Sequence, residues 1–254
     1  MTKTLAHQLA DYAGALRFED LSKEVVHEVK RRVIDSIGCA LGAWNEEPCV
    51  IARKVASEFS AKNGATIIGT SHKSPPDWAA FATGCCIRYF DYNDTYLSKE
   101  PAHPSDNISA ALAVAECVGA NGRELITAIA LAYEVQCRLC DAASIRARGW
   151  DHVTYGAFST ALASTKLMKL DSERTRHAVN IARWVGADRY APDLMSNTRD
   201  LLYQAEEYFV KKAGAKPIST IARSVVQNAE DARLIAMNRK QEEDSRQHRS
   251  PRRK

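Results

Sequence analysis

The segment Ser22–Gly42, with the sequence SKEVVHEVKRRVIDSIGCALG, decides the fold class of this chain. Its apolar residues recur three or four positions apart, which predicts an amphipathic α-helix with one face in a core. Ser22 precedes this pattern and is a candidate N-cap. Gly38 and Gly42 carry no side chain near the end of the helix, so another segment could pack closely there. The apolar positions of the stripe are Val25, Val26, Val29, Val33, Ile34 and Ile37.

Helical periodicity also dominates the segments that follow. The one short β-like run, Ala65–Gly69, is bounded by glycines and predicts a loop or an isolated strand. We therefore predict an all-α fold, a multi-helix antiparallel bundle-like domain whose alanine and glycine faces pack closely. The further helices that we expect are one that begins after Pro48, then Trp78–Tyr89, Ile108–Val118, Gly122–Leu139, Thr154–Leu170, and Glu173 to about Val185 with Asp171 as its cap.

The bulk composition is that of a soluble globular protein, because 45% of the 254 residues are hydrophobic and 26% are charged. No apolar run approaches the roughly 20 residues that span a bilayer, and the N-terminus has no signal-peptide core. We therefore expect a cytoplasmic protein that does not enter a membrane. The net charge of +4 comes from residues 237–254, where seven basic side chains outnumber three acidic ones. The basic charge belongs to a tail, which predicts no specific binding of nucleic acid.

Seven cysteines, an odd number, lie mostly in apolar or helical segments. In a cytoplasmic protein they are expected to be reduced and to act as small hydrophobic residues. Cys137 and Cys140 form a C-x-x-C pair, but no second pair at zinc spacing follows. We therefore predict no metal site.

A polar segment, Phe90–Asn107 with the sequence FDYNDTYLSKEPAHPSDN, falls outside the helical pattern. His103 lies between prolines, which hold its backbone extended, and Ser105 or Asp106 could cap the helix that follows. An imidazole near carboxylates and a helix N-terminus is suited to proton transfer on an anionic substrate. The alternative is a polar surface loop whose histidine caps a neighbour.

Three stretches of the chain resemble the MmgE/PrpD family of 2-methylcitrate dehydratases and cis-aconitate decarboxylases. They are VIDSIGCALG at 33–42, the pair DYNDT at 91–95 and EPAHPSDN at 100–107, and RARGWDHVTYGAF at 146–158. The resemblance extends over about residues 4 to 182. It implies a helical N-terminal domain, which a smaller lid domain follows in full-length members. It also implies a homodimer that acts on small di- and tricarboxylates without a metal or an organic cofactor.

The resemblance also implies site residues: His103, Asp91 and His152 for catalysis, with Thr95 as a substrate ligand. Histidine can give or take a proton near neutral pH, so we expect His103 to be the main acid/base group. His152 would contact substrate or share the proton, Asp91 would orient an imidazole or a substrate hydroxyl, and Thr95 would bind a carboxylate.

Some of these residues also have plainer interpretations. His152 could instead be a histidine that is satisfied at a helix start. Lys99, Arg146 and Arg148 are further candidates for pairing with substrate charge, although solvated loop charges are the more ordinary interpretation of all three.

The chain departs from the family pattern after residue 182, where no tryptophan-lysine segment follows. We expect residues 1–182 to form the family's helical domain, residues 183–237 a divergent helical extension, and residues 238–254 a disordered basic tail. We also expect the lid domain to be missing. Two hypotheses follow. The chain is either a 2-methylcitrate dehydratase-like lyase of propionate breakdown, truncated and impaired, or a non-catalytic helical remnant that dimerises.

Overall fold

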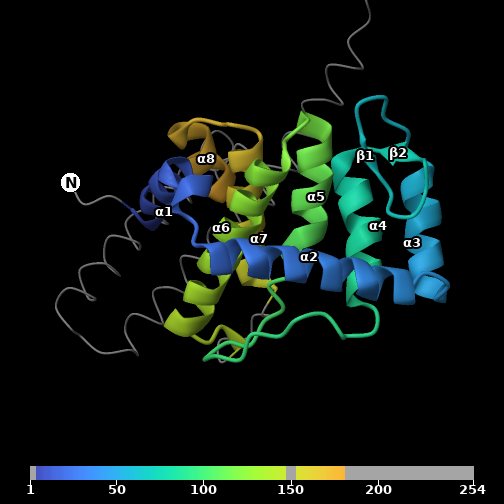
Figure 1. Ribbon diagram of the computed structural model, residues 1–254, viewed down its shortest axis with the longest axis horizontal. Coiled ribbons are helices and arrows are strands. Elements are labelled where there is room, and N and C mark those ends of the chain that lie inside the picture. Colours follow the sequence, from blue (N-terminus) through green and yellow to red (C-terminus); the bar gives the residue numbers. More distant parts are fainter. Residues whose placement is uncertain (1–3, 147–152, 181–254) are drawn as a thin grey trace, which may run out of the picture. The chain divides into compact units, whose positions relative to one another are not determined.

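A computed structural model of the chain describes residues 4–146 and 153–180 (Figure 1). These residues contain eight α-helices, a 3-10 turn and a two-stranded hairpin, so the all-α prediction is confirmed. The elements are α1 (Leu5–Ala15), η1 (Phe18–Asp20), α2 (Lys23–Gly42), α3 (Glu47–Ser57), β1 (Ala65–Thr66), β2 (Lys73–Ser74), α4 (Pro76–Arg88), α5 (Asp106–Val118), α6 (Gly122–Ala142), α7 (Thr154–Leu167) and α8 (Ser172–Val179). The expected segments 183–237 and 238–254 lie outside the described residues.

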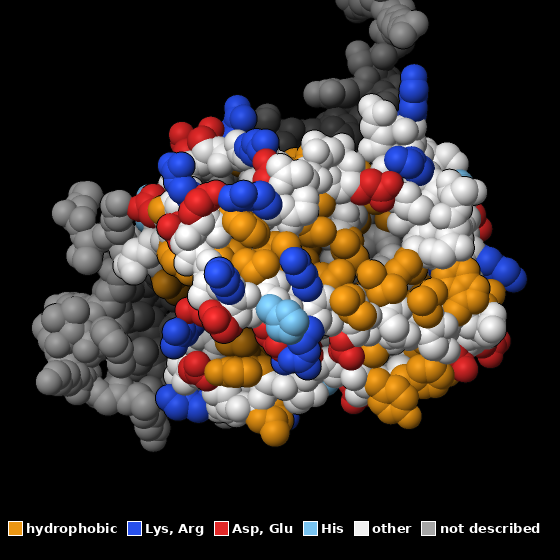
Figure 2. Space-filling view, viewed as in Figure 1, with side chains coloured by type: hydrophobic (Ala, Val, Ile, Leu, Met, Phe, Trp, Pro, Cys, Tyr) orange, Lys and Arg blue, Asp and Glu red, His pale blue; other side chains and the backbone are white. Residues whose placement is uncertain are grey.

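Helix α2 begins as its sequence predicts, because the Ser22 hydroxyl accepts a hydrogen bond from the Val25 N–H at 3.3 Å. The helix packs on α4 and α6 and crosses them at a steep angle in Figure 1. Val29 enters the core between the helices. In contrast, Ile34 and Leu41 are 71% and 56% exposed. Apolar side chains therefore gather on the face of the molecule that α2 crosses (Figure 2).

The core between α5, α6 and α7 consists largely of alanine. Small side chains let helix axes approach closely, and α6 packs along α7 while α5 contacts α4, α6 and α7. Ile108 and Ile129 fill the space that remains and are fully buried. The predicted close packing of small residues is therefore present at this interface. The alanines involved are Ala111, Ala115, Ala128, Ala130, Ala132 and Ala163.

Three local predictions need correction. Among the described residues no segment packs closely at Gly38 or Gly42, because a Cβ added at either would meet no atom within 4 Å. The β-like run at Ala65–Gly69 does not stand alone, because β1 pairs antiparallel with β2, whose Lys73–Ser74 sequence is too polar to suggest a strand. The predicted side-chain cap of α5 is also wrong. Ser105 already has helical φ and ψ, so the first N–H groups of α5 donate to the carbonyls of the preceding turn, as the Asp106 N–H does to His103.

The chain between α4 and α5 is the polar segment singled out from the sequence. It forms no regular element apart from one antiparallel bridge, in which Tyr96 and Ala102 exchange backbone hydrogen bonds of 2.8 and 3.0 Å. This segment carries the residues of the candidate site. Among the described residues, no helix is long and apolar enough to cross a membrane.

Candidate active site

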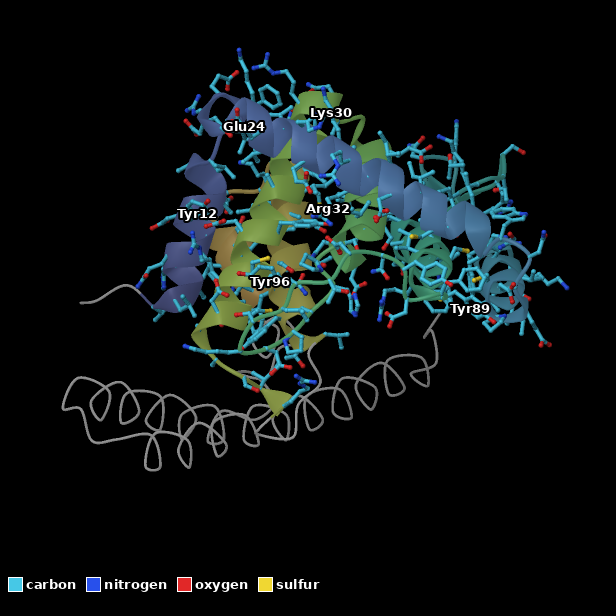
Figure 3. All side chains as sticks on the ribbon, turned by 60° about the horizontal axis from the view of Figure 1, so that its bottom comes forward. Tyr12, Glu24, Lys30, Arg32, Tyr89 and Tyr96 are labelled. Carbon is cyan, nitrogen blue, oxygen red and sulfur yellow. The ribbon has the colours of Figure 1, made fainter. Side chains whose placement is uncertain are left out.

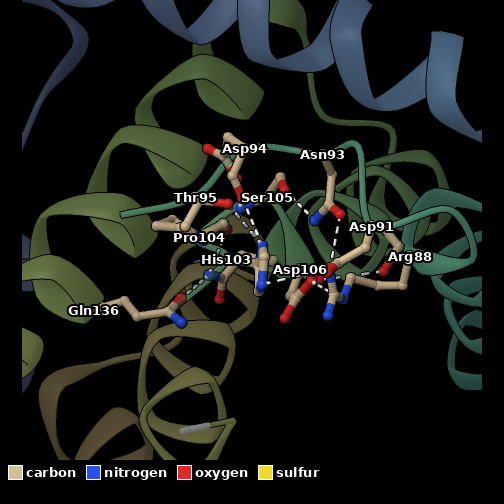
Figure 4. A network of polar contacts seen from close by, with 12 residues as sticks. Arg88, Asp91, Asn93, Asp94, Thr95, His103, Pro104, Ser105, Asp106 and Gln136 are labelled. Carbon is tan, nitrogen blue, oxygen red and sulfur yellow. Dashed lines mark hydrogen bonds and ion pairs between the residues drawn. The ribbon is translucent and has the colours of Figure 1, made fainter. Parts of the chain in front are cut away.

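His103 lies in the loop before α5, with its side chain 15% exposed (Figure 4). Its Nδ1 atom is 2.7 Å from the backbone carbonyl oxygen of Asp94. A carbonyl oxygen can only accept, so Nδ1 must carry the hydrogen that makes this bond. In the neutral ring the lone pair is then on Nε2, which lies 3.6 Å from Oδ1 of Asp91. The imidazole is thus arranged as a base at Nε2.

Asp91 is held where α4 ends. Its φ of 57° lies in the left-handed region, which aspartate tolerates better than most residues. Arg88, one turn earlier on α4, donates to Asp91 at 2.5 Å and to the Asn93 side chain at 2.8 Å. The same guanidinium lies 3.3 Å from Asp106 at the start of α5. Arg88 therefore joins the end of α4, the loop and α5 beside His103.

Asp94 connects the loop to two helices. Its carboxylate accepts the Ser105 N–H at 2.9 Å and the Tyr133 hydroxyl at 2.8 Å. Arg32 of α2 adds an ion pair at 3.7 Å. Figure 3 shows Arg32 and Lys30 on opposite sides of α2, with Arg32 on the side of the loop that contains Tyr96. Burial and then the Asp94 charge raise the pKa of Tyr133, so its hydroxyl remains a donor.

A buried polar network lies beneath His103. The Asn107 amide nitrogen donates to the Pro104 carbonyl at 2.9 Å and to Gln136 Oε1 at 2.5 Å. The amide oxygen accepts the Ser159 and Thr160 hydroxyls at 2.7 and 2.8 Å. Every polar group of this side chain is therefore satisfied by α6, α7 and the residue after His103.

Glu100 holds the other side of the loop. Its side chain is fully buried. One carboxylate oxygen accepts hydrogen bonds from the Ser144 hydroxyl and the Ile145 N–H, each at 2.8 Å. The other oxygen forms an ion pair with Arg146 at 2.7 Å. Burial alone would raise the pKa of Glu100, but these hydrogen bonds and the Arg146 charge outweigh it and lower the pKa. Asp141 fixes the middle of the loop by accepting the hydroxyls of Tyr96 and Ser98.

The MmgE/PrpD N-terminal domain matches residues 7–189. The chain belongs to the MmgE/PrpD family. It is 31% identical over 212 residues to a probable 2-methylcitrate dehydratase of Saccharomyces cerevisiae and 30% identical over 201 residues to the 2-methylcitrate dehydratase of Cupriavidus necator. It is also 28% identical over 193 residues to the cis-aconitate decarboxylase of Homo sapiens.

These matches cover most of this chain but less than half of each relative. The covered share of the chain is 74%, 73% and 72% in the three comparisons, against 41%, 41% and 40% of the relatives. Membership of the MmgE/PrpD family therefore rests on the helical N-terminal domain, and the chain spans less than half the length of these relatives.

The structure brings together three of the residues that the MmgE/PrpD resemblance implied. Asp91 and His103 face each other, and the Thr95 hydroxyl lies 3.4 Å from His103 Nδ1. Lys99 is exposed, and its charge acts on Asp141. Arg146 is paired with Glu100. The predicted residues His152 and Arg148 lie outside the described residues.

Sequence reasoning missed the groups that support these residues. Asp94 lies within the quoted loop, and its place three residues after Asp91 gave no sign of its separate contacts. Arg88 sits one helical turn before Asp91, a spacing that allows an ion pair. Tyr133 and Arg32 come from α6 and α2, so only the tertiary structure brings them to the loop.

No group of three or more histidine, cysteine, aspartate or glutamate side chains among the described residues is arranged to hold a metal ion. The C-x-x-C pair lies on α6, where burial raises the pKa of Cys137 to about 12 and that of Cys140 to about 11. Such thiols stay protonated at neutral pH, when they are poor nucleophiles and poor ligands.

Proposed function

We propose that this chain carries the acid/base part of a 2-methylcitrate dehydratase-type active site, which eliminates water from a small hydroxy tricarboxylate. The observation that carries the proposal is the state of His103. Its Nδ1–H is committed to the Asp94 carbonyl, which leaves Nε2 as the basic atom beside Asp91. The names of the relatives, 2-methylcitrate dehydratases, support the substrate and the reaction.

In the proposed reaction, Nε2 of His103 takes a proton from the carbon next to a substrate carboxylate. The electrons of the C–H bond form the C=C bond, and the C–O bond of the β-hydroxyl breaks. A proton donor, for which His152 is our candidate, protonates the departing oxygen so that water leaves. Asp91 stabilises the imidazolium that forms in the first step, because an opposite charge nearby favours the protonated ring.

The described residues supply one wall of such a site. A cavity of about 100 Å³ near this wall is lined by Gly84, Ile87, Arg88, Asp106 and Ser109, and its lining does not include His103 or Asp91. It is smaller than the roughly 300–1,000 Å³ of usual ligand pockets. Arg88 already meets Asp91 and Asp106, so its charge is partly neutralised before any substrate carboxylate arrives. We therefore propose weak tricarboxylate binding and slow turnover for this chain. A homodimer, a cytoplasmic location and a role in propionate breakdown are parts of the same proposal.

The test is turnover of 2-methylcitrate by the full chain, followed through the ultraviolet absorbance of the unsaturated product. We expect His103→Ala to abolish turnover, since a general base contributes roughly 10²–10⁴-fold. His27→Ala is the matched control, because His27 is exposed on α2 and should have no effect. Turnover that survives in His103→Ala, or its absence from the folded unmodified chain, would contradict the proposal.

A second candidate function, a helical dimerisation module without catalysis, is favoured by the exposed face of α2. Ile34 and Leu41 flank Gly38 on that face, and a Cβ placed at Gly38 would meet no atom within 4 Å. Light scattering should then report a dimer that Ile34→Asp dissociates. Ile51→Asp, on the exposed side of α3, should leave the mass unchanged. A monomer at all concentrations would rule out this function.

A further inference from the structure

The contacts of Asp94 reach beyond its own segment of the loop. Its carbonyl oxygen accepts the His103 Nδ1–H, and its carboxylate accepts the Ser105 N–H, two residues after His103. One residue therefore holds the imidazole and also closes the loop around it. The Thr95 hydroxyl, at 3.4 Å from Nδ1, is the longer and weaker contact of that nitrogen.

We propose that Asp94 is a positioning residue that sets the tautomer and orientation of His103. The inference rests on the proposed function of His103 as the acid/base group. Histidine side chains in water favour the tautomer with hydrogen on Nε2, which would place a donor where the base is needed. The carbonyl of Asp94 enforces the opposite tautomer, but only while it stays 2.7 Å from Nδ1.

The carboxylate of Asp94 is what keeps that carbonyl in place. It is 4% exposed and receives hydrogen bonds from the loop and from α6, together with the ion pair from α2. A carboxylate this deeply buried is costly unless it is fully paired, so its three partners fix it in one position. Tyr133 and Arg32 belong to helices that are anchored in the core. The loop around His103 is therefore fastened to α2 and α6 through one side chain.

Other charged groups around His103 do not account for the tautomer. Asp91, which Arg88 holds, faces Nε2, and the carboxylate of Asp106 is paired with the same Arg88 guanidinium at 3.3 Å. A carboxylate near Nε2 would by itself favour a hydrogen on Nε2, so it opposes the tautomer that the geometry requires. The hydrogen on Nδ1 must therefore be held by the Asp94 carbonyl.

The experiment is nitrogen NMR of the histidine side chains of the full chain in the absence of substrate, at a pH where the ring is neutral. The His103 signal is assigned as the one missing from His103→Gln. We expect hydrogen on Nδ1 in the unmodified chain, a shift towards the Nε2–H tautomer in Asp94→Ala, and recovery in Asp94→Asn, whose amide oxygen can still accept the Ser105 N–H.

Asp141→Ala is the matched control, because Asp141 also fastens this loop but contacts Tyr96 and Ser98 instead of His103. It should leave the tautomer unchanged. If Asp94→Ala fails to fold, Tyr133→Phe removes one of the three contacts and should shift the tautomer ratio in the same direction. The proposal is overturned if His103 of the unmodified chain carries its hydrogen on Nε2, or if folded Asp94→Ala or Tyr133→Phe keeps the original ratio.

Kinetics separate this inference from the proposed function. If 2-methylcitrate is turned over, Asp94→Ala should lower kcat by about tenfold or more, with KM changed by less than about threefold, since the base and not the binding is affected. An intact tautomer pattern without any turnover would overturn the dehydratase proposal and leave the role of Asp94 standing. Turnover that depends on His103 but is unchanged in Asp94→Ala would overturn the role of Asp94 alone.

Discussion

Replacing Asn107 by alanine should destabilise the helical domain far more than an ordinary buried polar substitution. The side chain is 1% exposed and makes four hydrogen bonds, to Pro104, Gln136, Ser159 and Thr160. Alanine removes all four hydrogen bonds, and its methyl group offers the four partner groups no replacement donor or acceptor. Ser159 can turn to the carbonyls of the preceding turn of α7, so the cost falls mainly on the other three partners.

The expected loss follows from these bonds. A buried hydrogen bond contributes about 1 kcal/mol net, and a partner that is left buried and unsatisfied costs more, roughly 1–3 kcal/mol. Thr160 is only half-buried and can bond water, so we count the three partners near the lower end of this range, which gives a loss of about 3–4 kcal/mol in the free energy of unfolding. This is a large share of the roughly 5–15 kcal/mol of a whole domain. With a urea m-value of about 2 kcal/mol/M, the midpoint should fall by about 1.5–2 M.

Urea denaturation followed by circular dichroism measures this change. Ser109→Ala is the matched control, because Ser109 is also buried on α5 but its hydroxyl makes a long 3.4 Å bond to a carbonyl of its own helix. It should cost less than about 1 kcal/mol. A double-mutant cycle with Gln136→Ala should show a coupling of about 1 kcal/mol or more. A loss in Asn107→Ala no larger than that of the control would refute the reasoning.

Three further results are expected. The lowered pKa of Glu100 means that its charged form stabilises the fold at pH values above its usual pKa of about 4.3. This stability is lost as pH falls through the lower pKa of the folded state. In Glu100→Gln the urea midpoint should therefore decrease less steeply with falling pH below about pH 5 than in the unmodified chain. An equally steep decrease would contradict this. Burial and neighbouring thiols raise the pKa of Cys49 to about 12, and the pKa of Cys137 is raised to the same value. Labelling of both thiols by iodoacetamide at pH 7.5, followed by mass spectrometry, should therefore be far slower in the folded chain than in urea. Equal rates would contradict the burial. Gly64→Ala should lower the free energy of unfolding, measured in urea, by more than about 2 kcal/mol, because the new Cβ would clash with a backbone oxygen of β2. Gly14 lies in open space within α1, so Gly14→Ala should raise the free energy of unfolding by up to about 1 kcal/mol. Similar effects of the two variants would contradict the clash.

The helices could be predicted because their signals are local. Ser22 caps α2, and the Asp171 carboxylate accepts the Arg174 N–H at the start of α8, as their places in the sequence predicted. The hairpin could not be predicted, since β2 is held by the buried Ser74, whose hydroxyl donates to the Ala56 carbonyl at the end of α3. This hydrogen bond joins residues 18 positions apart, and no sequence pattern within either segment predicts it.

The candidate site likewise contains residues that the sequence indicates and residues that only the packed structure brings together. The sequence singled out Asp91 and His103, the proposed acid/base pair, because both stand in a polar segment that no helical stripe includes. The residues that hold this loop in place could not be predicted from the sequence. Tyr133 occupies an ordinary position on the long helix α6, and Arg32 belongs to a run of basic residues on α2. Each meets Asp94 only after the helices pack. Sequence thus indicates which groups can react, and the tertiary structure decides the state in which they are held.

The networks around His103 connect the stability of the core to the chemistry of the loop. Asn107 holds the carbonyl of Pro104, the residue that follows His103, and Asp94 holds Ser105, the next one. A substitution in either network can therefore move the imidazole without touching a substrate. Loss of turnover alone would not identify a catalytic residue in this domain. The tautomer of His103 distinguishes a structural role from a positioning role. Asn107→Ala should lower the free energy of unfolding while the Asp94 carbonyl still holds Nδ1–H, whereas Asp94→Ala should release it.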